Sequence, residues 1–447
     1  MRTSRKMLSL LIVIVTIAAC VAAASFVLKP YGSKSQIIWS DFRQQENIDT
    51  LCIGSSLAAR SFDPAAIDEE FGTHSFNLST PNQQPAESYL GLKEAIEHHE
   101  LKSVVYGIDF GTFQHHSNLY PGRVFLNEKW KDDPFFERFG DLEYALGDSN
   151  WMFKEKSINW LFPWTEQHAR PSISGLMDNV RMKLDGTSLE TAAEANEKGW
   201  DYVGQGYGNY SQVVDYNKSK PTVFADRYEP RPLDKRSLAD LADIIELCND
   251  NDIDFIAIVP PMPEFSLISL QKHYSENSSA LKAFVEEHGG AYYDFNLAKP
   301  ELFKSEEGFY ADFQHCNFAG AKATTEALVR LIKMHEAGES TDDLFCSLGE
   351  RLAYIDHISI VRLKDTKENG SLKLTAEAFA GSNVEVEYRF LLKDGKTDEY
   401  SVLRDYSTDP TFEFTPPSKG QHMVKVEARV VGSDSAYDRY AEHTVYF

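Results

Sequence analysis

The sequence predicts an α/β protein joined to a C-terminal all-β domain, and three observations predict it. The chain has 447 residues, which at roughly 100–200 residues per domain predicts two or three domains. Between about residues 49 and 335, short apolar runs alternate with segments of helical spacing. After a polar, acidic linker at 337–343, the apolar period changes to two, which is typical of half-buried strands.

The first part of the chain has the pattern of a parallel sheet. Short apolar runs separated by helices favour a sheet covered on both faces, that is, a three-layer α/β/α arrangement. The predicted strands are 50–53 (TLCI), 75–78, 103–108, 255–259 and 291–295, and the predicted helices are 85–97, 233–248, 276–288 and 318–334. In such sheets, functional sites form at the carboxyl ends of the strands.

An aromatic-rich insertion, at about 115–230, interrupts this alternation. We expect it to form a cap over the strand ends. Its rings either form the core of the cap or line a cleft for a sugar or an acyl chain. They include Trp130, Trp151, Trp160, Trp164, Trp200, Tyr202, Tyr207, Tyr210 and Tyr216.

The C-terminal segment, residues 354–447, predicts about seven short strands. Seven alternating strands in under 100 residues indicate an immunoglobulin-like sandwich. Asp394-Gly395 is a favourable hairpin turn between two of these strands. The strands are expected at 358–363, 372–380, 384–392, 400–405, 411–415, 423–431 and 439–447.

The N-terminus predicts a membrane anchor. Residues 7–28 carry no charge, and Arg2, Arg5 and Lys6 precede them. At about 1.5 Å per residue this run can cross a hydrocarbon core of roughly 30 Å, and the basic flank favours a cytoplasmic N-terminus. We expect residues 1–30 to be a cytoplasmic stub and a single-pass anchor in the cell membrane, with the rest extracytoplasmic. Signal cleavage after 22–24, or lipidation at Cys20, are the alternatives.

Composition disfavours several classes of function. The formal net charge of -23 repels phosphate backbones and anionic lipid headgroups, so nucleic acid is not an expected partner. His98-His99 and His115-His116 have no Asp, Glu or Cys cluster around them, and the five cysteines show no paired spacing. We expect these histidines to be solvated, with no metal site and no cofactor.

Two short motifs carry the candidate chemistry. Gly54-Ser55-Ser56 ends the first predicted strand, where a serine hydroxyl can be presented at the sheet edge. Asp312 and His315 follow the last strand and precede the last helix. A serine nucleophile needs a base, and the base needs an orienting carboxylate. A doubly wound sheet can bring both motifs to the same edge, so we predict Ser56, His315 and Asp312 as a catalytic triad.

These motifs resemble those of the SGNH (GDSL-like) hydrolase superfamily, which has a flavodoxin-like sheet. Within it, the chain is similar to the anchored proteins of D-alanyl-lipoteichoic acid synthesis and alginate O-acetylation. The resemblance covers about 300 residues, within 31–345, and leaves the cap unmatched. It is carried by IDTLCIGSSLAARSFDP, FNLSTPNQQP, VVYGIDF and FYADFQHCNFAGA. It implies that Ser56 is the nucleophile, that Ser55 replaces the usual aspartate, and that Asp312 and His315 form the D-x-x-H pair.

The chain departs from this family at the oxyanion hole. Plain members have a glycine in the second motif and an asparagine in the third, whereas this chain has Asn77-Leu78-Ser79 and then Asp109. An ionised carboxylate cannot donate a hydrogen bond. The backbone amides of Ser56 and Ser79 are the expected donors, and Asp109 either binds a substrate hydroxyl or amine or is structural.

The expected function is therefore that of an extracytoplasmic serine esterase or acyltransferase. The resemblance implies acetyl or D-alanyl groups, a cell-wall or capsular glycan or teichoic acid as acceptor, and a membrane O-acyltransferase as partner. The acyl group, and transfer as against hydrolysis, stay open. The C-terminal region also resembles the triple-tyrosine immunoglobulin-like domains of bacterial surface proteins. The alternative function is a non-catalytic glycan-binding or adhesion protein on a degenerate SGNH fold.

Overall fold

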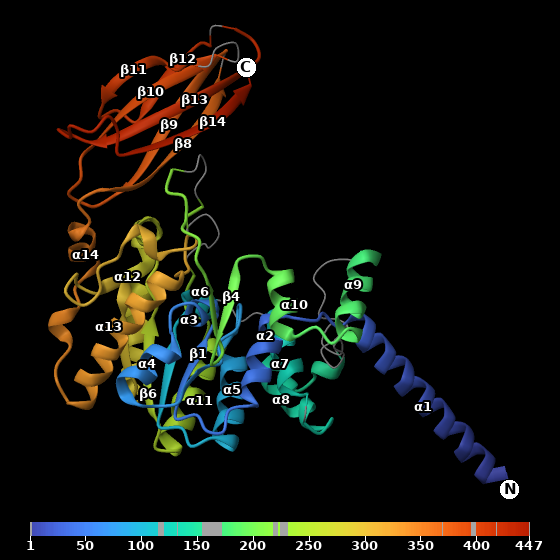
Figure 1. Cartoon of the computed structure of the whole chain (residues 1–447). Helices are drawn as coiled ribbons and strands as arrows, with labels where there is room; N and C mark the ends of the chain where they lie inside the picture. Colours follow the sequence, from blue (N-terminus) through green and yellow to red (C-terminus); the bar gives the residue numbers. More distant parts are fainter. Residues whose placement is uncertain are drawn as a thin grey trace. The chain divides into compact units, whose positions relative to one another are not determined.

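The computed structural model describes residues 2–114, 120–131, 133–153, 172–217, 222–223, 231–368, 370–394, 399–416 and 418–446, and Figure 1 shows the elements in chain order. Contacts divide the chain into two compact units. The first comprises Met1–Ser211, Pro232–Ile258 and Ala283–Tyr293. The second comprises Gln212–Arg231, Val259–Lys282 and Asp294–Phe447.

A parallel sheet forms the centre of the α/β part. Its strands are β1 (Thr50–Gly54), β2 (Ser75–Asn77), β3 (Ser103–Gly107), β6 (Asp254–Val259) and β7 (Ala291–Asp294). All five coincide with the apolar runs of the sequence. Their order, β2-β1-β3-β6-β7, is the flavodoxin-like doubly wound order, in which the strand order reverses between β1 and β3. The fold class is thus the predicted one.

The predicted helices of this part are present, with one correction. They are α5 (Pro85–His98), α11 (Lys235–Asp250), α12 (Glu264–Glu287) and α13 (Phe318–Glu336). The expected start of α12 at residue 276 is wrong, because the helix begins directly after Pro263. Its first turn buries Phe265, Ser266, Leu267 and Ile268 in succession, so this stretch has no polar face from which a helical period could be recognised.

Several further elements surround these. They are α1 (Arg2–Leu28), α2 (Lys34–Phe42), α3 (Ser56–Ala59), α4 (Pro64–Phe71), α6 (Phe110–Gln114), η5 (Phe295–Leu297), η6 (Glu307–Phe309), η7 (Asp342–Leu344) and α14 (Leu348–Tyr354). Residues Lys6–Leu28 of α1 are long and apolar enough to cross a membrane, as either an anchor or a signal sequence.

The described part of the insertion buries several of its aromatic rings, and Trp200 packs against Ile37 of α2. It contains α7 (Tyr120–Lys129), α8 (Glu137–Leu146), η1 (Trp151–Phe153), α9 (Ile173–Leu184), α10 (Leu189–Asn196), and the hairpin β4 (Trp200–Gly204) and β5 (Tyr207–Tyr210). Trp130, Trp151, Trp200 and Tyr207 are buried, so these rings form core rather than an open cleft. Trp160 and Trp164 lie outside the described residues.

The C-terminal segment has the seven predicted strands. They are β8 (Ile358–Glu368), β9 (Ser371–Ala380), β10 (Val386–Asp394), β11 (Ser401–Ser407), β12 (Thr411–Phe414), β13 (Gln421–Val430) and β14 (Arg439–Tyr446). They form an antiparallel sheet of order β11-β10-β13-β14 and a second of order β12-β9-β8. The predicted Asp394-Gly395 turn reaches outside the described residues.

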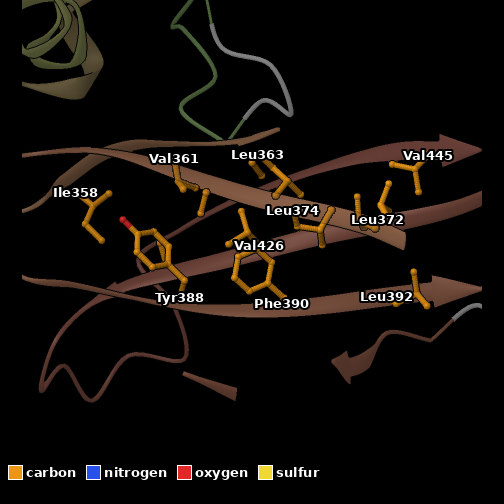
Figure 2. Packing of buried hydrophobic residues seen from close by; sticks show 14 residues of the cluster. Ile358, Val361, Leu363, Leu372, Leu374, Tyr388, Phe390, Leu392, Val426 and Val445 are labelled. Carbon is orange, nitrogen blue, oxygen red and sulfur yellow. The ribbon is translucent and has the colours of Figure 1, made fainter. Parts of the chain in front are cut away.

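Alternation along these strands builds an apolar core between the two C-terminal sheets. Tyr388, Phe390 and Leu392 of β10 point into the apolar cluster of Figure 2, together with Leu374 of β9 and Val426 of β13. Charged residues alternate with these and form pairs on the outer face, such as Arg389 with Glu427 at 2.9 Å, whereas Leu391, between Phe390 and Leu392, is a buried apolar exception. A period of two therefore separates core from surface, as in a packed pair of sheets.

A buried carboxyl group lies where α5 packs on α11. Glu87 is 2% exposed, and its Oε2 accepts a hydrogen bond of 2.8 Å from the Gln84 amide at the start of α5. Burial, with a further contribution from Asp240, raises the pKa of Glu87 from 4.5 to about 7. Between these two pH values the folded state keeps a proton that the unfolded chain has lost.

This pKa predicts how stability changes with pH. As pH rises from 4.5 to 7, Glu87 should lower the free energy of unfolding by about 3 kcal/mol, because one pKa unit corresponds to about 1.4 kcal/mol. Glu87→Gln keeps an acceptor for the Gln84 amide and cannot ionise. It should therefore be more stable than the parent protein at pH 8 and of similar stability at pH 4.5.

Denaturant titration followed by tryptophan fluorescence measures this difference, because all six tryptophans lie between residues 39 and 200 of the first unit. Glu94→Gln, on the same helix, is the control variant, and it should show no such pH-dependent gain. An equal effect of Glu87→Gln at both pH values would contradict the prediction.

Candidate functional site

The turn after β1 presents two serines in different environments. Ser55 precedes α3 and is 1% exposed, whereas Ser56 begins that helix and is partly exposed. The Ser55 hydroxyl accepts a hydrogen bond from the Leu57 amide at 3.2 Å and donates one to Asp109 Oδ2 at 2.8 Å. Ser55 is therefore a helix cap with a fixed side chain, and Ser56 is the serine that solvent can reach.

Asp109 links this turn to the turn after β3. Its Oδ2 accepts from the Ser55 hydroxyl, and its Oδ1 accepts from the Gly111 amide at 2.9 Å. Both turns lie at the carboxyl ends of β1 and β3, where the strand order of the sheet reverses. Two donors within the protein thus hold the Asp109 carboxylate. This arrangement fits a structural role for Asp109, the second of the two roles that the sequence left open.

Two glycines allow α3 to lie directly over this strand pair. Gly54 and Gly107 are register partners on β1 and β3, and Gly54 has a φ of 150°, which disfavours other residues. A Cβ atom added to Gly107 would lie 2.4 Å from the Cβ of Ala58. The close approach positions the Ser55-Ser56 turn against β3.

The second motif is buried beneath the same turn. Asn77 and Ser79 are both completely buried. The Asn77 side-chain amide donates to the carbonyl oxygens of Ala58 (3.2 Å) and Phe62 (2.9 Å), and its Oδ1 accepts from the Ser79 backbone amide at 3.2 Å. Asn77 therefore ties the end of α3 to β2, and an oxyanion would have to compete with Asn77 for the Ser79 amide.

The Asp312–His315 pair has the geometry of a base and its orienting group. Both carboxylate oxygens of Asp312 lie within hydrogen-bond distance of His315 Nδ1, at 3.0 and 2.9 Å. Asp312 Oδ1 also accepts from the backbone amides of Gln314 and His315, each at 3.0 Å. These bonds orient the carboxylate, favour a proton on Nδ1, and leave Nε2 as the basic nitrogen of the ring.

The loop that carries this pair is held at both ends. Tyr310 and Cys316 form an antiparallel bridge, and the Ala311 amide donates to the His315 carbonyl oxygen at 2.9 Å. The hydroxyl of Ser266, from the buried first turn of α12, donates to the Phe313 carbonyl oxygen at 2.5 Å. The His315 ring is therefore held by a pre-formed loop.

Gln314 is a residue of this site that the sequence analysis missed. Its side-chain amide lies 3.2 Å from His315 Nε2 and can donate a hydrogen bond to it. The only sequence signal was its place between Asp312 and His315, and a polar residue on a loop is too common to be diagnostic.

The structure thus brings together Asp312 with His315, Ser55 with Asp109, and Asn77 with Ser79. Ser56 belongs to the first compact unit, and the Asp312–His315 pair belongs to the second.

Of the two adjacent histidine pairs in the sequence, the structure describes only His98-His99. His99 packs against the Phe42 ring at 5.0 Å, and His98 lies 3.3 Å from Glu94. His115 and His116 are outside the described residues. Within the described ranges, no three His, Cys, Asp or Glu side chains converge as metal ligands.

Comparison with known proteins gives no family. No family model matches the chain, and no curated protein matches it. Among solved structures, a Streptococcus pneumonia protein provisionally named as a platelet activating factor is 10% identical, with a TM-score of 0.31, over 67% of this chain and 92% of its own. A Bacteroides fragilis protein provisionally named as an acylhydrolase is 8% identical, with a TM-score of 0.29, over 67% of this chain and 94% of its own.

A third similarity is to the extracellular domain of a B. thetaiotaomicron protein provisionally named as a hybrid two-component system. It is 20% identical, with a TM-score of 0.14, and covers 17% of this chain and 10% of that one. Because all three TM-scores are low, the function proposed next rests on the residues of this chain alone.

Proposed function

We propose that this protein is a serine esterase or acyltransferase in which Ser56 is the nucleophile, His315 the general base and Asp312 its orienting group. The observation that carries the proposal is the double contact of Asp312 with His315 Nδ1, at 2.9 and 3.0 Å. A carboxylate there favours the tautomer whose Nε2 can accept a proton from a serine hydroxyl.

The proposed reaction has two steps. In the first, Ser56 Oγ attacks the carbonyl carbon of an ester while His315 Nε2 takes the hydroxyl proton. The ester C–O bond then breaks, the same proton passes to the leaving alcohol, and an acyl-Ser56 intermediate remains. In the second step, His315 takes a proton from water or from an acceptor hydroxyl, whose oxygen attacks the acyl carbon. The bond between the acyl carbon and Ser56 Oγ then breaks, and His315 returns the proton to Ser56 Oγ.

We assign supporting roles to the remaining motif residues. Ser55 and Asp109 orient the nucleophile turn through their 2.8 Å hydrogen bond, and Asn77 holds the far end of α3. The backbone amide of Ser56 is the proposed oxyanion donor, with the Ser79 amide as a second donor if Asn77 releases it.

The proposed location is the outer face of the cell membrane. The apolar helix α1 and its basic N-terminal flank favour a retained single-pass anchor with the α/β part outside. There, the sequence resemblance favours acetyl or D-alanyl transfer to envelope polysaccharide or teichoic acid, with a membrane O-acyltransferase as partner.

A second candidate function is a non-catalytic glycan-binding or adhesion protein. The observation that favours it is Asp109, which accepts two hydrogen bonds where plain SGNH enzymes carry an oxyanion donor. In that case Ser56 would be an ordinary turn residue without unusual reactivity.

Labelling with a fluorophosphonate separates the two functions. We expect the folded protein to form a covalent adduct, and peptide mapping to place it on Ser56, because only a serine activated by a nearby base reacts rapidly with such a probe. Ser55→Ala should still be labelled, and heat-denatured protein should not. A folded protein without any adduct would favour the binding function.

A further inference from the structure

The side chain of Gln314 lies beside the ring nitrogen of His315 that transfers the proton in the proposed reaction. Its amide nitrogen is 3.2 Å from His315 Nε2. Asp312 lies against the other ring nitrogen, at 2.9 and 3.0 Å, which favours a proton on Nδ1 and makes Nε2 an acceptor. The Gln314 amide therefore donates one of its N–H groups to Nε2.

The backbone of Gln314 is held in place, while its side chain is accessible to solvent. Its backbone amide donates to Asp312 Oδ1 at 3.0 Å, in the same turn that holds His315. The Gln314 side chain is partly exposed, and the His315 side chain is 13% exposed. A small molecule that binds at Nε2 therefore has the Gln314 amide within reach.

A side-chain amide offers more hydrogen-bonding groups than the contact with His315 uses. It has two N–H donors and one acceptor oxygen, and the contact with Nε2 involves one N–H. A hydroxyl group is likewise both a donor and an acceptor. The Gln314 amide can thus bind a hydroxyl group in either direction while its backbone stays in place.

The second step of the proposed reaction brings a hydroxyl group to this position. The acceptor oxygen must lie about 2.6–3.2 Å from Nε2 to pass its proton to His315, so it lies close to the Gln314 amide. Water has one oxygen, which must release its proton to the ring, attack the acyl carbon and also satisfy the amide. A molecule with hydroxyl groups on adjacent carbon atoms divides these tasks between two oxygens, and the two contacts fix its orientation.

We propose that Gln314 is a specificity-determining residue that binds a second hydroxyl group of the acceptor. The site then favours acyl transfer to a molecule with hydroxyl groups on adjacent carbon atoms, as in a sugar or a polyol, over hydrolysis. This inference rests on the proposed function and names the class of acceptor for the same site.

In the transfer, one hydroxyl group of the acceptor gives its proton to His315 Nε2 while its oxygen forms a bond with the carbonyl carbon of acyl-Ser56. The bond between that carbon and Ser56 Oγ then breaks, and His315 returns the proton to Oγ. The products are the monoester of the acceptor and the restored serine. Gln314 holds the neighbouring hydroxyl group and exchanges no proton.

Two isomeric diols test the inference. Propylene glycol has its hydroxyl groups on adjacent carbon atoms, whereas trimethylene glycol has them at the two ends of its chain. The full-length protein receives p-nitrophenyl acetate and one of the diols, at equal concentrations. Release of p-nitrophenol reports formation of the acyl-enzyme, and gas chromatography measures the ratio of diol monoacetate to free acetate.

Three variants are compared with the parent protein. Gln314→Ala removes the amide, and Gln314→Met removes its hydrogen-bonding groups while keeping the length of the side chain. Gln212→Ala is the matched control, because Gln212 has the same side chain at the same loop. Its amide, however, donates to the Ala311 carbonyl oxygen at 3.4 Å rather than to the histidine ring.

In the parent protein, the ratio of monoacetate to acetate should be about fivefold higher with propylene glycol than with trimethylene glycol, which is the net effect of one hydrogen bond. Both Gln314 variants should reduce this preference to less than about twofold. Their release of p-nitrophenol should stay within about threefold of the parent rate. Gln212→Ala should keep the preference.

Three results would overturn the inference. They are equal transfer to both diols by the parent protein, release of p-nitrophenol without monoacetate from either diol, and a preference that survives in both Gln314 variants. Loss of p-nitrophenol release in both Gln314 variants would also overturn it, because Gln314 would then serve formation of the acyl-enzyme. Failure of the proposed function is seen separately. The parent protein and Ser56→Ala would then release p-nitrophenol at the same rate, and the inference would fall with the acyl-Ser56 intermediate.

Discussion

Ser56→Ala is expected to lower kcat for an activated ester such as p-nitrophenyl acetate by at least about 10³-fold, because it removes the only proposed nucleophile. His315→Ala should cause a loss of the same order. Since the two groups act in one proton transfer, the double variant should be no worse than either single variant. Steady-state kinetics on the three proteins measures this.

Ser55→Ala is the matched control for this prediction. It removes a helix cap that contributes about 1 kcal/mol and the hydrogen bond to Asp109, so the rate should fall by less than about tenfold. Multiplicative losses in the Ser56/His315 double variant would show that the two residues act independently and would defeat the proposed mechanism.

Asp312→Asn should reduce kcat by about 10²- to 10⁴-fold with little change in KM. The amide oxygen can still accept from the Gln314 and His315 backbone amides, which Asp312 Oδ1 now does. The new NH₂ group, however, faces His315 Nδ1 and can only donate. It therefore favours the tautomer in which Nε2 carries the proton and cannot accept another.

Asp109→Asn makes the same chemical change in a different place. There, the oxygen can still accept from the Gly111 amide, and the new NH₂ can donate to the Ser55 hydroxyl, which is able to accept. Its kcat should stay within about tenfold of the parent value. Equal losses from Asp312→Asn and Asp109→Asn would contradict the assigned roles.

The most local features of this protein were predictable from its sequence. Asp312 and His315 are three residues apart on one loop, so short-range geometry alone lets the carboxylate reach the ring. The strands β1, β3 and β6 coincide with apolar runs because fully buried strands need apolar side chains on both faces.

Other features depended on contacts between distant segments. Ser55 and Asp109 are 54 residues apart, and they meet only because the register of β1 and β3 places Gly54 opposite Gly107. The sequence places Asn77 in the second motif, but only the fold shows that its buried side-chain amide ties the end of α3 to β2.

By itself, then, the sequence determined the order of the main strands and helices, the change of period at the C-terminal strands and the pairing of Asp312 with His315. Periodicity and short loops specify these features within a few residues. Only the tertiary structure decided that Asp109 holds the Ser55–Ser56 turn and that α9 exposes an apolar stripe. Both depend on which segments meet in space, and one local pattern is compatible with many such partners.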